Sequence, residues 1–199
     1  MELDITLYEY LPSRSKQARW TLLELDLEFK SIEGRDILHG DALKQVNPMG
    51  KVPAVVINGK PLFEAAAICT YLADLVPEKE LVAASGTYER AQHMQWTSFA
   101  LTEMEAYVWS NARNTFVLPE EQRVTALFEQ NNKAYVHAAK VLDKVLGNSD
   151  FLVGNQFSVT DILVGATVNW GNMVGLLERT PNLQDYLGRL KDRPNCTLS

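Results

Sequence analysis

The chain changes its folding pattern once, near Pro77. Before this point, short stretches with the polar–apolar alternation of strands interchange with stretches of helical periodicity. After the small, polar segment "EKELVAASGTY" the chain carries long helical patterns and no convincing strand. We therefore expect an α/β unit of about 80 residues followed by an all-helical unit of about 115. The expected domains are residues 1–77 and 88–199, joined by a linker at 78–87.

The first unit is predicted to have the order β-α-β-α-β-β-α. The segments that indicate these elements are "LDITLY", "SKQARWTLLEL", "EFKSIE", "GDALKQV", "PAVVI", "PLF" and the helix from about Glu64 to Leu75. Asn58-Gly59 suits the type I′ turn of a tight hairpin. Pro53 starts a strand, and an X-Pro bond in a tight turn can be cis. A cis bond there would aim the main chain of Val52 outward, where an extended peptide ligand could pair with it.

The second unit carries four helical patterns. They begin near Thr87, at Pro119, near Ser158 and at Pro181. In "SVTD", the Ser158 hydroxyl and the Asp161 carboxylate fit a capping box, which is a folding feature rather than a catalytic one.

Composition and short motifs exclude several classes of function. With 46% hydrophobic and 22% charged residues among 199, the chain reads as globular, and its formal net charge of -6 argues against nucleic acid as a partner. No apolar run approaches the ~18–20 residues of a membrane span, and the N-terminus lacks the basic region of a signal peptide. Two distant cysteines suggest no disulfide framework, so a cytoplasmic protein is expected. The three histidines lack metal-ligand spacing, and neither a P-loop nor a G-x-S-x-G pattern occurs.

Three segments carry a resemblance to a known family: "SRSKQARWTLLEL", "NPMGKVPAVVINGKPLFEAAAICTYL" and "FLVGNQFSVTDILVGA". Together with the order of elements, they make the whole chain resemble the cytosolic glutathione transferases, in particular serine-type, bacterial-like members. The resemblance implies a thioredoxin-like first domain, a helical second domain and a homodimer. It also implies glutathione as co-substrate and no metal.

By this resemblance, a set of first-domain residues would bind glutathione. Lys51 would reach the glycyl carboxylate, and the main chain of Val52 would pair with the cysteinyl unit. Glu64 would hold the amino group, and the N–H of Ala65, at a helix N-terminus, would hold the γ-glutamyl carboxylate. The family usually has Ser at this last position, so a hydrogen bond is missing here. His39, in the loop before the second helix, is a further candidate near the glycyl carboxylate.

Glutathione chemistry needs a thiolate, and a thiol of pKa ~8.5 is only a few per cent ionised at pH 7. The family supplies a hydroxyl donor or a cysteine near the start of the first helix. Cysteine is absent from "YEYLPSRSKQARW". The resemblance favours Ser13 as donor, and Ser15 is the alternative; either serine could instead cap the helix. Tyr8 and Tyr10 are expected to pack or to hydrogen-bond locally.

The expected activity is conjugation of the glutathione thiolate to an electrophilic, largely apolar small molecule. The residues expected to line the pocket for that second substrate are Tyr107, Trp109, Arg113 and Trp170. Two alternatives stay open. The same site could serve a glutathione-dependent peroxidase, isomerase or dehalogenase, or the fold could act as a non-catalytic protein-interaction module.

Overall fold

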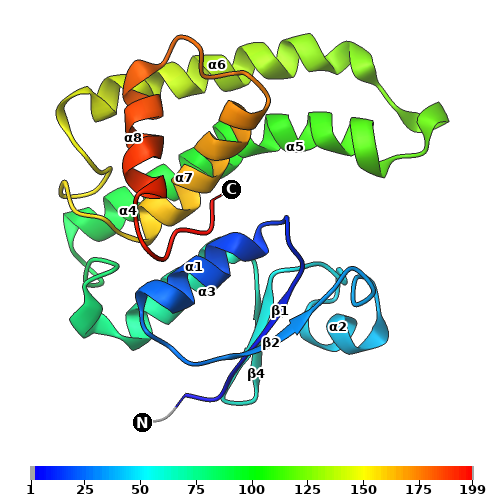
Figure 1. Ribbon diagram of the computed structural model, residues 1–199, viewed down its shortest axis with the longest axis vertical. Helices are drawn as coiled ribbons and strands as arrows, with labels where there is room; N and C mark the ends of the chain where they lie inside the picture. The colour runs from blue at the N-terminus through cyan, green and yellow to red at the C-terminus, as the bar shows by residue number, and fades with distance from the viewer. Residues whose placement is uncertain (1–2, 199) are drawn as a thin grey trace. The chain divides into compact units, whose positions relative to one another are not determined.

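The computed structural model describes residues 3–198 and divides the chain into two compact units. One unit runs to Ser85 and takes up the chain again from Arg193, and the other is Gly86–Asp192. The first unit contains a sheet with helices, and the second is helical, which confirms the expected fold class (Figure 1).

The first unit has the predicted element order. Its elements are β1 (Ile5–Glu9), α1 (Ser15–Glu24), β2 (Lys30–Glu33), α2 (Asp41–Val46), β3 (Ala54–Ile57), β4 (Lys60–Phe63) and α3 (Ala65–Leu75). The four strands form one mixed sheet in the order β2-β1-β3-β4. Strand β1 is parallel to β2 and antiparallel to β3, and β3 is antiparallel to β4.

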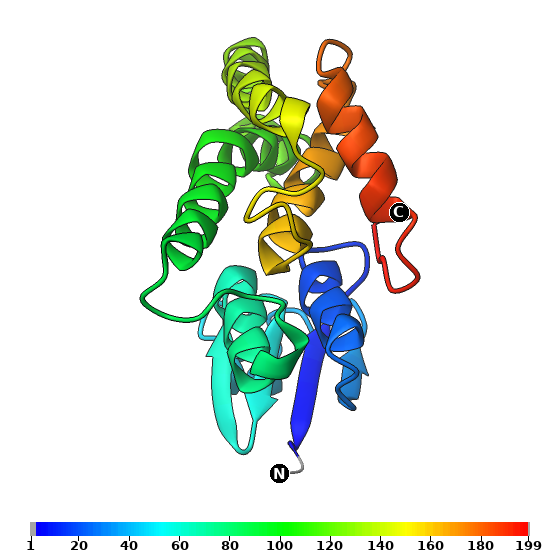
Figure 2. The same cartoon turned by 90° about the vertical axis from the view of Figure 1, so that its left-hand side faces the viewer.

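Alternation along the strands divides the buried residues between the two faces of this sheet. Helices α1 and α3 pack against each other, and Figure 2 shows them side by side. Helix α2 contacts β3 and β4, with Leu43, Val46 and Ala54 forming a small buried core. Tyr8 and Val52 pack against this core, as expected for Tyr8. Since neighbouring strand residues point to opposite faces, the buried Leu7 faces away from α2.

The hairpin between β3 and β4 has the predicted turn. Asn58 and Gly59 both have positive φ, at 49° and 76°, which is the signature of type I′. The Val52-Pro53 bond is cis, as the sequence allowed, and Leu11-Pro12 is a second cis bond that the sequence reasoning did not anticipate.

The C-terminal tail belongs to the first unit, although the sequence placed everything from residue 88 onward in the helical domain. The Arg193 guanidinium donates two hydrogen bonds to the Glu24 carboxylate, at 3.0 and 2.8 Å, and Thr197 Oγ1 donates to Lys16 O at 2.8 Å. Glu24 also accepts from the indole N–H of Trp20 at 2.8 Å. These partners are far apart in the chain, so no local sequence pattern predicts that the C-terminal tail packs on α1.

The second unit consists of five α-helices joined by shorter helical turns. They are α4 (Tyr88–Ala100), α5 (Ala106–Ala112), α6 (Phe128–Val145), α7 (Val159–Met173) and α8 (Pro181–Lys191). Helix α4 packs on α7, α5 on α6, and α8 on both α6 and α7. Most residues of α7 are buried, and it begins with the predicted capping box of Ser158 and Asp161.

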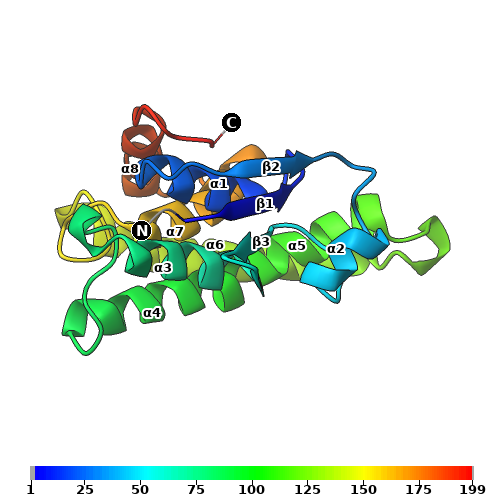
Figure 3. The same ribbon diagram turned by 90° about the horizontal axis from the view of Figure 1, so that it is seen from below.

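Two of the predicted helices are wrong in detail. The first contains the π-helical turn Leu101–Glu105 and continues past its predicted end at Arg113 through a second π-helical turn, Arg113–Val117; α4 and α5 follow one another along one line (Figure 3). The second begins at Phe128 instead of Pro119, because two separate 3₁₀ turns occupy residues 120–127. A hydrogen bond from Val124 N to the side-chain Oδ1 of Asn114, at 2.8 Å, holds this connection to the end of the preceding helix.

Candidate functional site

Strand register brings three predicted segments together at one end of the sheet. Tyr8 pairs with Ala54, and Ala54 pairs with Phe63. One step beyond these pairs, the chain after β1, the turn before β3 and the start of α3 therefore lie side by side. The first holds the candidate serines, the second holds Lys51 and Val52, and the third holds Glu64 and Ala65.

The turn before β3 is held by hydrogen bonds to the side chain of Asn47. The buried Asn47 donates from Nδ2 to Lys51 O at 2.8 Å and accepts from Met49 N at 3.0 Å. Lys51 is exposed and Val52 is half-buried. Within residues 3–198, the N–H and C=O of Val52 make no intramolecular hydrogen bond. An extended ligand strand could therefore pair with Val52 without displacing a protein partner.

Glu64 has an unusual backbone conformation at the start of α3. Its φ of 73° and ψ of 117° lie where a non-glycine residue costs about 1–3 kcal/mol and persists only when its surroundings hold it. Its C=O accepts from Ile68 N at 2.9 Å, and its side chain is exposed and makes no capping bond. The first-turn N–H groups of α3, beginning with Ala65, therefore remain available to an anion. Ala65 itself is 8% exposed.

The two candidate serines form one hydrogen-bonded pair. Ser13 Oγ donates to Ser15 Oγ at 2.9 Å and accepts from Ser15 N at 3.0 Å. Ser15 Oγ also accepts from Tyr10 N at 3.3 Å. Ser15 is fully buried, whereas Ser13 is partly exposed. Of the two serines, only Ser13 is partly exposed to solvent, so it is the one that a ligand could reach.

His39 lies beside the turn before β3. Its N–H donates to Gly50 O at 2.9 Å, and its side chain is exposed. Gly50 has φ +61°, and a Cβ there would lie 2.8 Å from the Cα of His39. This close approach requires glycine and ties His39 to the residue before Lys51.

The predicted second-substrate residues lie in the second unit and are brought together only in part. The rings of Trp109 and Trp170 meet edge to face, with centroids 6.4 Å apart. Arg113 is exposed and lies one helical turn after Trp109. Tyr107 precedes Trp109 by two residues, which places it on a different face of α5.

Sequence reasoning missed the buried carboxylate at the end of β1. Glu9 is fully buried, accepts from Arg19 Nε at 2.8 Å and from a second nitrogen of the same guanidinium, and accepts from Ser31 Oγ at 2.5 Å. The hydrogen bond to Glu9 raises the pKa of the Arg19 guanidinium above its usual value. The alternation of "ITLYE" places residue 9 on the same face as Ile5 and Leu7, and this was the available signal.

Other potentially reactive groups are inaccessible or scattered. Burial raises the pKa of the Cys69 thiol to about 12, which makes it inert, as its apolar setting suggested. Over residues 3–198, no group of three or more His, Cys, Asp or Glu is arranged to hold a metal ion. Over the same range, no helix has the length and apolarity needed to cross a membrane.

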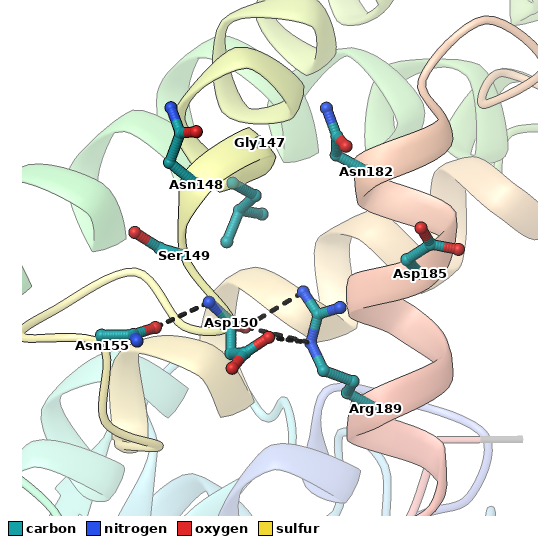
Figure 4. Close-up of a pocket in the computed structure, with 9 residues that line it drawn as sticks. Gly147, Asn148, Ser149, Asp150, Asn155, Asn182, Asp185 and Arg189 are labelled. Atoms are coloured by element: carbon teal, nitrogen blue, oxygen red, sulfur yellow. Dashed lines mark hydrogen bonds and ion pairs between the residues drawn. The ribbon is translucent and has the colours of Figure 1, made fainter.

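A polar hollow of about 300 Å³ lies elsewhere, in the second unit. Figure 4 shows Arg189 of α8 reaching toward Asp150, whose carbonyl oxygen accepts from two guanidinium nitrogens at 3.3 Å each. None of the predicted site residues lines this hollow.

Two family models together match most of the chain. Residues 3–74 match the model described as "Glutathione S-transferase, N-terminal domain", and residues 91–194 match "Glutathione S-transferase, C-terminal domain". The chain belongs to the glutathione S-transferase family. The second of these matches alone covers more than half of the chain.

Individual glutathione S-transferases agree over nearly the full length. Glutathione S-transferase GstA of Escherichia coli O157:H7 is 27% identical over 191 residues, covering 95% of this chain and 89% of that protein. The structure of a sphingomonad glutathione S-transferase complexed with glutathione has a TM-score of 0.83 at 26% identity, covering 96% of this chain and 94% of its own. The bacterial beta-class enzyme of Sphingomonas chungbukensis has a TM-score of 0.84 at 28% identity, covering 96% and 94%.

Proposed function

We propose that this glutathione transferase joins the glutathione thiolate to an electrophilic, largely apolar small molecule. The observation that carries the proposal is the convergence of three segments at one end of the sheet: the serine pair, the main chain of Val52, which has no hydrogen-bond partner among residues 3–198, and the first turn of α3, which has no side-chain cap. These three features offer a hydroxyl for the thiol, main-chain N–H and C=O groups for the peptide backbone, and helix N–H groups for a carboxylate of a tripeptide thiol.

Glutathione would lie extended along this sheet end. The main chain of Val52 would pair with the cysteinyl unit, and the Lys51 ammonium would approach the glycyl carboxylate, with His39 close to the same end. Glu64 would hold the amino group, while the Ala65 N–H and the positive end of the α3 dipole would hold the γ-glutamyl carboxylate.

Ser13 is the proposed hydroxyl donor to the thiolate. Lowering a thiol pKa by about 2 units takes about 2.7 kcal/mol, and a hydrogen bond to a charged group contributes about 1.5–3 kcal/mol. Exposure supports Ser13 over Ser15, because the Ser15 hydroxyl is fully buried and already accepts two hydrogen bonds.

The second substrate is proposed to contact the helical unit. The half-buried Trp109–Trp170 pair offers an apolar surface, and Arg113 is the charged group one turn away. Tyr107 stays in the proposed set, although its place on α5 gives it the least support. Peroxidase, isomerase or dehalogenase chemistry would use the same thiolate and is separated from conjugation by product analysis.

We further propose a homodimer. Apolar side chains are exposed in each unit, including Tyr71 at 44% in the first and Met94 at 56% in the second. Light scattering after gel filtration is expected to give twice the chain mass, and a monomer at micromolar concentration would contradict this.

A thermal shift with glutathione tests binding first. Glutathione at 100 times its Kd should add about 2.7 kcal/mol, or roughly 5–10 °C for a chain of this size. No shift at millimolar glutathione would refute binding and favour the protein-interaction alternative, to which the missing Ser at position 65 lends some support.

Turnover of an aryl halide tests the donor. Ser13→Ala is expected to lower kcat/KM by about 10- to 150-fold, the equivalent of one hydrogen bond to a charged group. Glutathione affinity should change far less. Equal activity in the variant and the wild type would exclude Ser13 as donor.

A further inference from the structure

The hydrogen bond between the Ser13 and Ser15 hydroxyls can run in either direction, because each hydroxyl can donate or accept. The Ser13 hydroxyl donates to Ser15 Oγ over 2.9 Å, and Tyr10 N donates to the same oxygen over 3.3 Å. Ser13 Oγ in turn accepts from Ser15 N at 3.0 Å. The hydroxyl closer to solvent is thus held by one that solvent does not reach.

A thiolate beside Ser13 would change the direction of this bond. A hydroxyl has one proton, so Ser13 cannot donate to the sulfur and to Ser15 at the same time. When the Ser13 proton turns to the sulfur, Ser15 Oγ loses a donor, and its own proton can then be donated to Ser13 Oγ over the same 2.9 Å. No proton moves between the serines, and the thiol proton is released to solvent.

We propose that Ser15 is a positioning residue that orients and polarises the Ser13 hydroxyl once the thiolate is bound. This proposal rests on the proposed function, in which Ser13 is the donor. A hydroxyl that accepts a hydrogen bond becomes a better donor, because bonds in a chain polarise one another by about 10–30% each. The Ser15 side chain is fully buried, so solvent does not compete with Ser13 for its hydroxyl.

The pKa of the bound glutathione thiol is the test, read from thiolate ultraviolet absorbance against pH. Ser13→Ala is expected to raise this pKa by about 1–2 units. Ser15→Ala should raise it by about half a unit, with the same displacement in the pH profile of kcat/KM. Ser15→Thr keeps the hydroxyl and should restore the wild-type value.

Thr21→Val is the matched control. Thr21 is also fully buried on α1, and its hydroxyl donates to Gln17 O at 2.9 Å, away from the serine pair. It should lower the melting temperature without moving the thiol pKa. The comparison of Ser15→Ala with Thr21→Val holds even if Ser15→Thr does not fold.

The outcomes separate the two proposals. A displaced pKa in Ser13→Ala together with a wild-type pKa in Ser15→Ala would overturn the role of Ser15 and leave the donor in place. A wild-type pKa in Ser13→Ala would overturn the donor, and the role of Ser15 with it. An equal displacement in Thr21→Val would show a general effect of loosening α1 and would also overturn the role of Ser15.

Discussion

The Glu9 carboxylate offers a quantitative test of how the loop before α1 is held. Glu9 is fully buried at the end of β1 and receives three hydrogen bonds, two from Arg19 on α1 and one from Ser31 on β2. The perturbation is Glu9→Gln, which keeps the shape and removes the charge. An amide presents one oxygen instead of two, so the Arg19 guanidinium would meet an N–H₂ group in place of an acceptor.

The expected loss of stability follows from the burial of the two partners. Removing one partner of a buried ion pair costs about 3–5 kcal/mol. The Arg19 side chain is 26% exposed and can regain some hydration, so we expect a smaller loss than this, about 2–3 kcal/mol. For a chain of this length that corresponds to a melting temperature lower by about 4–12 °C.

Urea unfolding followed by tryptophan fluorescence measures this change, since Trp20 on α1 is fully buried in the same unit. The matched control is Glu33→Gln. Glu33 acts on Arg19 only through its charge and is exposed, so its loss should cost less than about 1 kcal/mol. Exposed ion pairs contribute only about 0–1 kcal/mol. A Glu9→Gln variant within about 0.5 kcal/mol of wild type, or no less stable than Glu33→Gln, would therefore show that the buried pair contributes no more than an exposed one, contrary to this prediction.

Three further predictions concern one residue each. Ala65→Ser should tighten glutathione binding in calorimetry by up to about 10- to 150-fold if its hydroxyl reaches the ligand carboxylate, and unchanged affinity would contradict this. Gly171→Ala should cost about 1–3 kcal/mol or more in denaturant unfolding, because its Cβ would lie 1.9 Å from the Tyr135 hydroxyl; a neutral substitution would count against this packing. Burial raises the pKa of Asp161 from 3.8 to about 6, against the hydrogen bonds that it accepts from Leu152 N, Ser158 and Tyr186. Its stabilising contribution is therefore complete below pH 4 and is lost as the pH rises through 6. The stability of wild type relative to Asp161→Asn should fall by about 1 kcal/mol from pH 5 to pH 7, and a flat difference would contradict the shift.

Features that depend on neighbouring residues could be predicted well. The Asn58-Gly59 turn and the Ser158–Asp161 capping box are fixed by side chains and backbone preferences within four residues, and both are present. The start of the second long helix was predicted too early, at Pro119 instead of Phe128. Two 3₁₀ turns occupy this stretch, and Val124 N donates to Asn114 Oδ1, ten residues earlier in the chain, which is too distant for a local pattern to indicate.

The candidate site likewise combines features set by neighbouring residues with features set by contacts between distant parts of the chain. The chemical groups of the site can be read from the chain itself: two hydroxyls at the start of α1, a lysine and a proline before β3, and an acid before α3. The tertiary fold brings these segments together, because their meeting depends on the register of β1, β3 and β4, whose partners lie up to about 50 residues apart. It also decided that Ser15 is buried while Ser13 is open. That difference comes from how α1 packs in the folded unit, and two serines only two positions apart carry no local signal of it.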